Sequence, residues 1–489
     1  MSDTESKVQP DIQVNLNVIK GVMNYTQDLI EKNIYIHENN YFTVLYLSGL
    51  ADPSPLLKII STNLNHVEQP DRSPIGMTQI ERFVTEFSAR YIDTIGQIVD
   101  DLIVGQTIFL FDGSSTAISF DTLAVNTRSI KEPENEVTIK GPHDGFNELL
   151  ENNIALVRFH CPSPSLTVEY RQLGKITKNR VAILSMKGIV SEEILQEIHQ
   201  RISNIPYDSV LDANYLEEWI TDDRVTLFPL LESTERPDRV AGSLLEGRVA
   251  IMLNGVPMTL LAPYLFLQSF QVNEDYYWRY HIASALRLLR LFCGFVTLYL
   301  PAFFVATITY HHEFLPTRFL MSIAQGQEPV PYPTLVEILL MEVAFEILRE
   351  AGLRLPRQVG SAVSIVGALV IGQAAVQAGI ISPVTVILVS FTGICSFTLP
   401  SNTSAFAIRM LRFAMIITAG FLGYVGIITA GILLLVHLAS LRSFGVPYLS
   451  PLAPFNLSMS TDIFIRRPLY MSKRRPSIFR VDERERFRR

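Results

Sequence analysis

Hydrophobic and polar positions divide the 489-residue chain into four parts. Over residues 1–95 the spacing is mainly helical and is interrupted by polar, proline-containing links, so we expect a mostly helical region. Residues 96–285 carry short apolar runs between turn residues and amphipathic stretches, which predicts an α/β domain. Residues 286–445 are apolar over long runs, which predicts an all-α domain of membrane-spanning helices. Residues 446–489 form a basic tail.

Two β-hairpins are predicted in the α/β domain. Thr107–Phe111 and Thr116–Phe120 are apolar runs on either side of an Asp-Gly pair, which favours the positive φ of a tight turn. Arg248–Leu253 and Val256–Leu261 flank an Asn-Gly pair and give the strongest hairpin signal in the chain. Between the two hairpins, the apolar run Val181–Met186 predicts a further strand.

A helix is predicted after that strand, and no catalytic motif accompanies it. Ser191 to Ile205 carries apolar residues at helical spacing behind a serine cap. The sequence has no GxxxxGK, no GxGxxG after a strand, no HExxH and no GxSxG. Cys161, Cys293 and Cys395 are too far apart for a disulfide framework or a cysteine-rich zinc site. We therefore expect no enzyme activity, no metal site and no cofactor.

Four membrane spans are predicted from the apolar runs. Residues 291–312 have no acidic or basic side chain other than histidine and are long enough for a hydrocarbon core of roughly 30 Å. Residues 358–408 contain no Asp, Glu, Lys or Arg, and Ser382-Pro383 divides this run into a helical pair. The four expected spans are Leu291–His312, Val359–Ile381, Val384–Pro400 and Phe413–Leu441.

Residues 333–350 form a possible fifth membrane helix. Glu342, Glu346 and Glu350 recur every four residues, so their carboxylates share one helical face. As an interfacial amphipathic helix, the segment would expose these groups to water. In a buried helix they would face water or a pore, because a charge at membrane depth is expensive. In a ring of subunits the three glutamates would then attract cations, and both interpretations stay open.

The span Val359–Ile381 has the composition of a closely packed helix or of a narrow pore. Small residues recur along it and let helices approach closely in lipid. Ser361 and Gln373 are among its few polar residues. If this span lines a pore, Val366 and Val370 are candidates for a hydrophobic gate.

The charge distribution separates two environments. Residues 1–250 hold 21 Lys and Arg against 36 Asp and Glu, a net charge of −15. Residues 251–489 hold 20 against 12, a net charge of +8. The acidic first half argues against nucleic-acid binding, which needs a basic surface. The first 15 residues lack the features of a signal peptide, so we expect a cytoplasmic N-terminal domain.

Basic residues predict the topology and also produce a conflict. Ten Lys or Arg follow Asp462, which favours a cytoplasmic C-terminus and an even number of spans. With four spans, however, four arginines would lie outside, namely Arg318, Arg349, Arg354 and Arg357. A fifth span at residues 333–350 would correct this and would instead expel the tail, so the conflict stays open.

An ordered series of segments over residues 95–455 resembles the A subunit of the GerA-type spore germination receptors. The segments are Thr234–Asp238, Leu244–Val249, Asn254–Pro257, Glu274–Tyr277, Arg349–Ala351, Arg354–Pro356, Ile371–Ala375, Arg409 with Arg412, and Ser443–Tyr448. The match departs at Arg158–Cys161, where the family usually carries a run of arginines. Within the series, we expect structural roles for Glu235, Arg236, Pro237, Asp238, Gly255, Pro257, Arg354 and Pro356.

The resemblance implies a subunit of a nutrient-responsive receptor in the inner membrane of the dormant spore. It implies two partners, which are a transporter-like B subunit that binds the germinant and a C subunit that is a lipoprotein. It further implies a homo-oligomer, a pentamer, that is embedded in membrane lipid and conducts monovalent cations once nutrient is bound. A non-conducting scaffold that passes the signal to another channel and a secondary transporter of a small solute are the alternatives.

Overall fold

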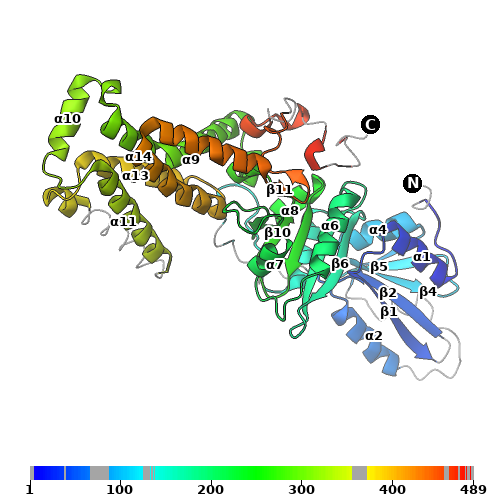
Figure 1. The fold of residues 1–489 in the computed structure, drawn as a ribbon. Coiled ribbons are helices and arrows are strands. Elements are labelled where there is room, and N and C mark those ends of the chain that lie inside the picture. Colours follow the sequence, from blue (N-terminus) through cyan, green and yellow to red (C-terminus); the bar gives the residue numbers. More distant parts are fainter. Residues whose placement is uncertain are drawn as a thin grey trace.

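The computed structural model shows an α/β region on one side and a bundle of helices on the other (Figure 1). The residues it describes are 5–37, 40–66, 87–124, 133, 136, 138–354, 372–455, 462–471, 474–479, 481 and 485. The α/β region contains two five-stranded sheets, in which every pair of neighbouring strands is antiparallel.

The first sheet has the strand order β1-β2-β4-β5-β3. The predicted hairpin forms β4 and β5, with Phe109 opposite Ile118, so this prediction is confirmed. Apolar side chains of one face pack with helices α1 and α4, and Phe42, Phe109 and Phe120 form a second cluster. The elements are α1 (Ile12–Val22), β1 (Leu29–His37), β2 (Asn40–Leu47), α2 (Ser54–His66), β3 (Ala89–Ile92), α4 (Ile95–Ile103), β4 (Gln106–Phe111) and β5 (Ala117–Asp121).

The prediction of a mostly helical region over residues 1–95 is wrong for the part that the structure describes. Three of the five strands of the first sheet, β1, β2 and β3, lie within this range. Strands β2 and β3 pair with β4 and β5, so a boundary at residue 95 would cut through one sheet. Strand β1 is an edge strand with Glu31, Lys32 and Asn33 in its middle, and such a polar strand is stabilised by its pairing with β2 rather than by its own pattern.

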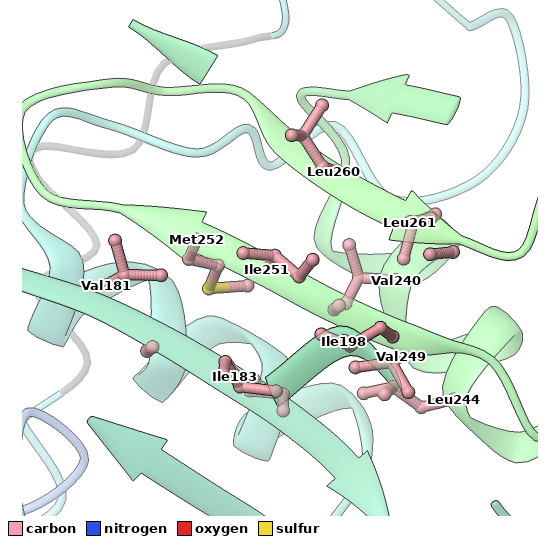
Figure 2. Packing of buried hydrophobic residues seen from close by; sticks show 14 of the residues in the cluster. Val181, Ile183, Ile198, Val240, Leu244, Val249, Ile251, Met252, Leu260 and Leu261 are labelled. Carbon is pink, nitrogen blue, oxygen red and sulfur yellow. The ribbon is translucent and has the colours of Figure 1, made fainter. Parts of the chain in front are cut away.

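The second sheet has the strand order β6-β7-β9-β10-β8. Its core gathers side chains of β7, β9 and β10 against α6 and α8, including Val181, Ile251 and Ile198 (Figure 2). The predicted strand, the helix after Ser191 and the Asn-Gly hairpin are all confirmed, and Gly255 has a φ of +89° in the turn. The elements are α5 (Leu150–His160), β6 (Leu166–Leu173), β7 (Asn179–Met186), α6 (Glu192–Ser203), α7 (Ala213–Ile220), β8 (Glu232–Thr234), α8 (Pro237–Leu245), β9 (Val249–Leu253) and β10 (Thr259–Ala262).

A buried ion pair joins the two sheets. Arg158, near the end of α5, donates from Nη2 to Asp28 Oδ1 at 2.8 Å and to Thr26 Oγ1 at 3.1 Å. Both side chains of the ion pair are almost fully buried. The backbone N–H of Gln27 donates to the carbonyl of Val168 at 3.0 Å, next to the ion pair. Separating the two sheets would leave these buried charges without partners, and the loss of one partner from a buried ion pair lowers stability by about 3–5 kcal/mol. The two sheets are therefore expected to move as one body.

The helical region contains two helices that are long and apolar enough to cross a membrane, as judged by length and composition in the described residues. These are α9 and α14, and α9 includes most of the predicted first span. The predicted span Val384–Pro400 corresponds to α13, which has 15 residues and is shorter than the roughly 20 that a perpendicular crossing needs. The predicted span Val359–Ile381 lies outside the described residues up to residue 371. The helices are α9 (Tyr280–Tyr310), α10 (Thr317–Gln327), α11 (Thr334–Arg354), α13 (Pro383–Phe397) and α14 (Asn402–Ser440).

Helix α14 is folded back on itself, so the single span predicted at Phe413–Leu441 is wrong. Gly423 interrupts the helix with a φ of 58° and a ψ of −140°, and Gly426 lies so close to the backbone of Thr418 that no Cβ would fit. Both ends of α14 contact the α/β region, because Ser404 Oγ lies 2.8 Å from Ser269 Oγ and His437 Nε2 lies 3.0 Å from Thr226 Oγ1. Residues 402–422 and 424–440 are therefore two antiparallel helices.

The basic tail packs against the α/β region. After the short hairpin of β11 (Arg442–Ser443) and β12 (Val446–Pro447), the chain returns to the second sheet. Phe479 and Val481 are buried in the core of that sheet. At least part of the segment predicted as a separate tail thus belongs to the α/β fold.

Candidate functional site

The Thr234–Asp238 segment forms a buried ion pair within the chain. The Arg236 guanidinium donates from Nε to Asp238 Oδ1 at 3.0 Å and from Nη2 to Oδ2 at 2.9 Å. It also donates to Thr138 Oγ1 at 2.9 Å and to the carbonyl of Pro142 at 3.1 Å. Pro237 occupies the first turn of α8, where its missing N–H costs nothing. The backbone N–H of Glu235 donates to Glu136 Oε2 at 3.1 Å, so the whole segment is fixed.

Asp238 connects this segment to the turn that precedes the helical region. That turn is η3 (Asn273–Tyr276). Asp238 Oδ2 accepts from Asn273 Nδ2 at 3.0 Å and from the hydroxyl of Tyr277 at 2.6 Å. Burial would raise the pKa of Asp238, but the hydrogen bonds from Arg236 and Tyr277 outweigh it and lower the pKa. Burial and the bond to Asp238 raise the pKa of the Tyr277 hydroxyl.

The same turn contacts α9 through Asp275. This carboxylate is fully buried and accepts from Arg287 Nε at 2.9 Å. It also accepts from Arg290 Nη2 at 2.9 Å and Nη1 at 3.0 Å. Two guanidiniums one helical turn apart on α9 are thus attached to one acid outside the helix. We call the connected set the junction, and its members are Arg236, Asp238, Asn273, Asp275, Tyr277, Arg287 and Arg290.

Glu274 and the tail hold the junction from two further directions. Glu274 Oε1 accepts from the indole N–H of Trp278 at 3.1 Å and from the backbone N–H of Lys140 at 3.1 Å. From the tail, Arg466 donates to the carbonyls of Tyr276 and Trp278, each at 3.3 Å. Arg287 donates from Nη1 to the carbonyl of Asp462 at 2.5 Å. A displacement of η3 therefore requires α8, α9 and the tail to adjust together.

A cleft of about 450 Å³ lies beside the junction. Asp238, Asn273 and Tyr277 line it from the junction, and Leu469 and Arg475 line it from the tail. Arg475 itself donates from Nε to the carbonyl of Leu245 at 3.0 Å. The shape of this cleft therefore depends on how the tail packs on α8.

The predicted carboxylate face of α11 packs on the first segment of α14. Glu342 and Arg412 are both fully buried, with Oε2 2.6 Å from Nη2. Glu346 Oε1 accepts from Arg409 Nε at 3.0 Å and lies 3.3 Å from Arg412 Nη2. Helix α11 is thus part of the bundle, and arginines compensate the charges of Glu342 and Glu346. We expect this cluster to fix α11 against α14, because a buried charge without its partner is costly.

The other residues proposed from the sequence lie in different places. Glu350 is 59% exposed and pairs with Arg354 at 2.6 Å. Gln373 is exposed in a helical segment at residues 372–377. Pro257 lies between β9 and β10, next to the turn at Gly255. Ser361, Val366, Val370 and Pro356 lie outside the described residues.

Sequence reasoning missed the acid at the centre of the junction. The sequence analysis singled out the Glu274–Tyr277 segment, but nothing in it connected Asp275 with Arg287. The available signal was that Arg287 and Arg290 lie one turn apart on a helix and so present two guanidiniums to one side. In the described residues, no group of three or more His, Cys, Asp or Glu is placed to hold a metal ion.

Comparison with known proteins identifies the family. The family model for the Bacillus/Clostridium GerA spore germination protein matches residues 17–478. Spore germination protein KA of Bacillus subtilis is 42% identical over 96% of this chain and 87% of its own length. Spore germination protein A1 of the same organism is 34% identical over 96% of each chain. The crystal structure of the N-terminal domain of the A subunit of the Bacillus megaterium spore germinant receptor GerK3 is 28% identical and covers 54% of this chain and 98% of its own, with a TM-score of 0.42. The chain belongs to the GerA family of spore germination proteins.

Proposed function

We propose that this chain is the A subunit of a nutrient-responsive germinant receptor in the spore inner membrane. Family membership supports a role in the receptor, and the two apolar helices α9 and α14 support association with a membrane. Several copies, a pentamer, form a channel that releases monovalent cations when a B-type subunit binds germinant. A C-type lipoprotein completes the complex, and both ends of the chain lie in the cytoplasm.

The junction is the observation that carries this proposal. A receptor subunit that gates a channel must transmit a displacement from its folded domain to its membrane helices. The turn η3 is suited to this, because hydrogen-bonded charges hold it on both sides. On one side Asp238, which pairs with Arg236, accepts from Asn273 and Tyr277, and on the other side Asp275 accepts from Arg287. A shift of α8 in the α/β region would therefore act on the first turns of α9.

The ion pairs on α11 change the expected route of the cations. Glu342 and Glu346 face Arg412 and Arg409, so they contribute little net negative charge to a pore. We retain Glu350 as the cation-attracting residue, because its side chain is exposed and its pair with Arg354 is screened by water. Val366 and Val370 remain the proposed hydrophobic gate, with Ser361 and Gln373 on the same span.

The experiment that tests the proposal is monovalent-cation flux into liposomes that contain the full chain with its B-type and C-type partners. Replacing Val366 or Val370 by Ala should widen the constriction and produce flux without germinant. The control is Val425→Ala, which changes a valine that is exposed on the outside of α14. Normal, tight liposomes with both gate variants would reject the gate.

The same assay separates the alternative functions. Flux that never appears, with every partner present, would favour a non-conducting scaffold. Saturable, substrate-dependent flux in the purified chain alone would favour a secondary transporter. Replacing all three glutamates together is a poor test of selectivity, because loss of Glu342 would leave Arg412 buried and uncompensated. Glu350→Gln is the informative single change.

A further inference from the structure

The loop between α7 and β8 exposes apolar side chains next to the end of a membrane helix. Val225 is 90% exposed and Leu227 is 50% exposed. The residue between them, Thr226, lies with its Oγ1 3.0 Å from His437 Nε2 in the last turn of α14. The side chains of Val225 and Leu227 therefore lie close to the last turn of the second segment of α14.

Neighbouring residues fix this loop and give it an amphipathic character. Phe228 is buried among the aromatic rings of Phe266 and Tyr448, so the loop has a firm base. The Arg224 guanidinium lies 5.1 Å from the ring centre of Trp219 on α7. Asp223 accepts from the backbone N–H of Val225 at 2.9 Å, which holds the exposed valine in place. Tryptophan and arginine are residue types that favour the boundary between lipid and water.

The exposed apolar surface continues onto α14. Leu433 and Val436 are 66% and 61% exposed on the segment that carries His437. Arg442, which lies shortly after the end of α14, is exposed. An apolar helix face, a basic residue at its end and an apolar loop attached to its last turn are arranged as at the surface of a bilayer.

We infer that residues 219–227, together with Arg442, form a membrane-interface anchor that inserts Val225 and Leu227 into the phospholipid surface on the side of the α/β region. The anchor would set the distance between the second sheet and the membrane. It would also hold the α/β region while α9 moves, so that a displacement at the junction acts on the helix.

Tryptophan fluorescence of the full chain can test this inference, because the sequence contains two tryptophans, Trp219 and Trp278. Trp219 is replaced by Tyr, which also favours the lipid–water boundary, and Trp278 is replaced by Phe. Val225→Trp then provides a single probe in liposomes of phosphatidylcholine and phosphatidylglycerol. A second probe at Leu227→Trp covers the case in which the first variant folds poorly. The control probe is Tyr35→Trp, which is 68% exposed. It belongs to β1 of the first sheet, which lies away from the helical region formed by α9 to α14 (Figure 1).

We expect brominated phospholipids to quench the probe at residue 225 or 227 several-fold more strongly than the control probe, and aqueous acrylamide to quench it less. Equal quenching of probe and control by brominated lipid, with free access of acrylamide, would overturn the inference. Weak quenching by both reagents would also overturn it, because the loop would then be covered by protein, as at a contact with a neighbouring copy of the chain.

Discussion

The substitution Asp275→Asn tests whether the junction connects the α/β region to α9. The carboxylate of Asp275 is fully buried and accepts hydrogen bonds from Arg287 and Arg290 at 2.9–3.0 Å. Asparagine has nearly the same volume, so the change removes the charge and one acceptor without opening a cavity. Two guanidiniums, one of them fully buried, would lose their counter-ion.

The free energy that opposes opening of the junction should fall by about 3–5 kcal/mol, the usual cost of removing one partner from a buried ion pair. The lower end is the better estimate here, because Arg287 keeps the carbonyl of Asp462 and Arg290 keeps the carbonyl of Phe270. Since a factor of ten corresponds to about 1.4 kcal/mol, local opening of the junction should become roughly 100-fold more frequent.

Hydrogen–deuterium exchange of the full chain in detergent micelles measures this opening directly. Amides of η3 and of the first turns of α9 should exchange faster in the variant, whereas amides of the first sheet should not change. The matched control is Asp100→Asn, an exposed position on α4. Exchange at η3 within about threefold of the wild type would refute the reasoning, because the charge pairs would then contribute little to holding the junction.

Three further predictions test the tail, the end of helix α5 and the helical bundle. Phe479→Ala should destabilise the α/β region by about 3–5 kcal/mol in thermal unfolding, because the ring is buried in the core, whereas the exposed Phe455→Ala should have little effect. The hydrogen bond that His160 Nε2 donates to the carboxylate of Asp144 raises the pKa of His160, so the stabilisation is present below the unfolded pKa of about 6.5 and is lost as pH rises through the higher folded value. His160→Gln should therefore remove part of the decrease in unfolding midpoint between about pH 6 and pH 8, and an unchanged decrease would contradict this. In the bundle, Arg412→Met should reduce thermal stability more than the double variant with Glu342→Gln does. A loss in the double variant equal to the sum of the two single-variant losses would show that the pair is not coupled.

Much of the second sheet could be predicted because its signals are local. The Asn254-Gly255 turn requires a positive φ and lies between two apolar runs, so the hairpin of β9 and β10 is specified within 14 residues. Strand β7 and helix α6 follow each other with clear periodicity. The edge strand β1 lacks such a signal, because its middle is polar and its stability comes from pairing with β2.

The contacts that make up the candidate site could not be predicted from local pattern. Glu274 meets Lys140 across 134 residues, and Asp238 meets Tyr277 across 39. A sequence shows that such residues are polar in an apolar setting, but not which opposite charge the fold brings to them. Arg236 and Asp238 differ, because they are two residues apart and their opposite charges can be read from the sequence itself.

The fold-back of α14 could have been suspected from length. A straight helix of 39 residues would measure roughly 58 Å, about twice the hydrocarbon core of a bilayer. Hydropathy did not mark the turn, because the residues on both sides of Gly423 are apolar and no proline or charge interrupts them. Glycine at this position is required by the backbone, since a φ of 58° is unfavourable for residues with a Cβ.

The direction of α11 resolves most of the conflict over topology. Leu335, at the start of α11, packs on Gly420, and Glu346 pairs with Arg409, so α11 runs antiparallel to the first segment of α14. That segment begins next to Ser269 in the α/β region, so the end of α11 that carries Arg349 and Arg354 lies on the same side. Arg349 and Arg354, which the four-span topology places outside, thus lie on the side of the α/β region, where the basic tail also packs. By the positive-inside rule this side is the cytoplasmic one in the proposed topology, and Arg318 on α10 is the basic residue at the opposite end.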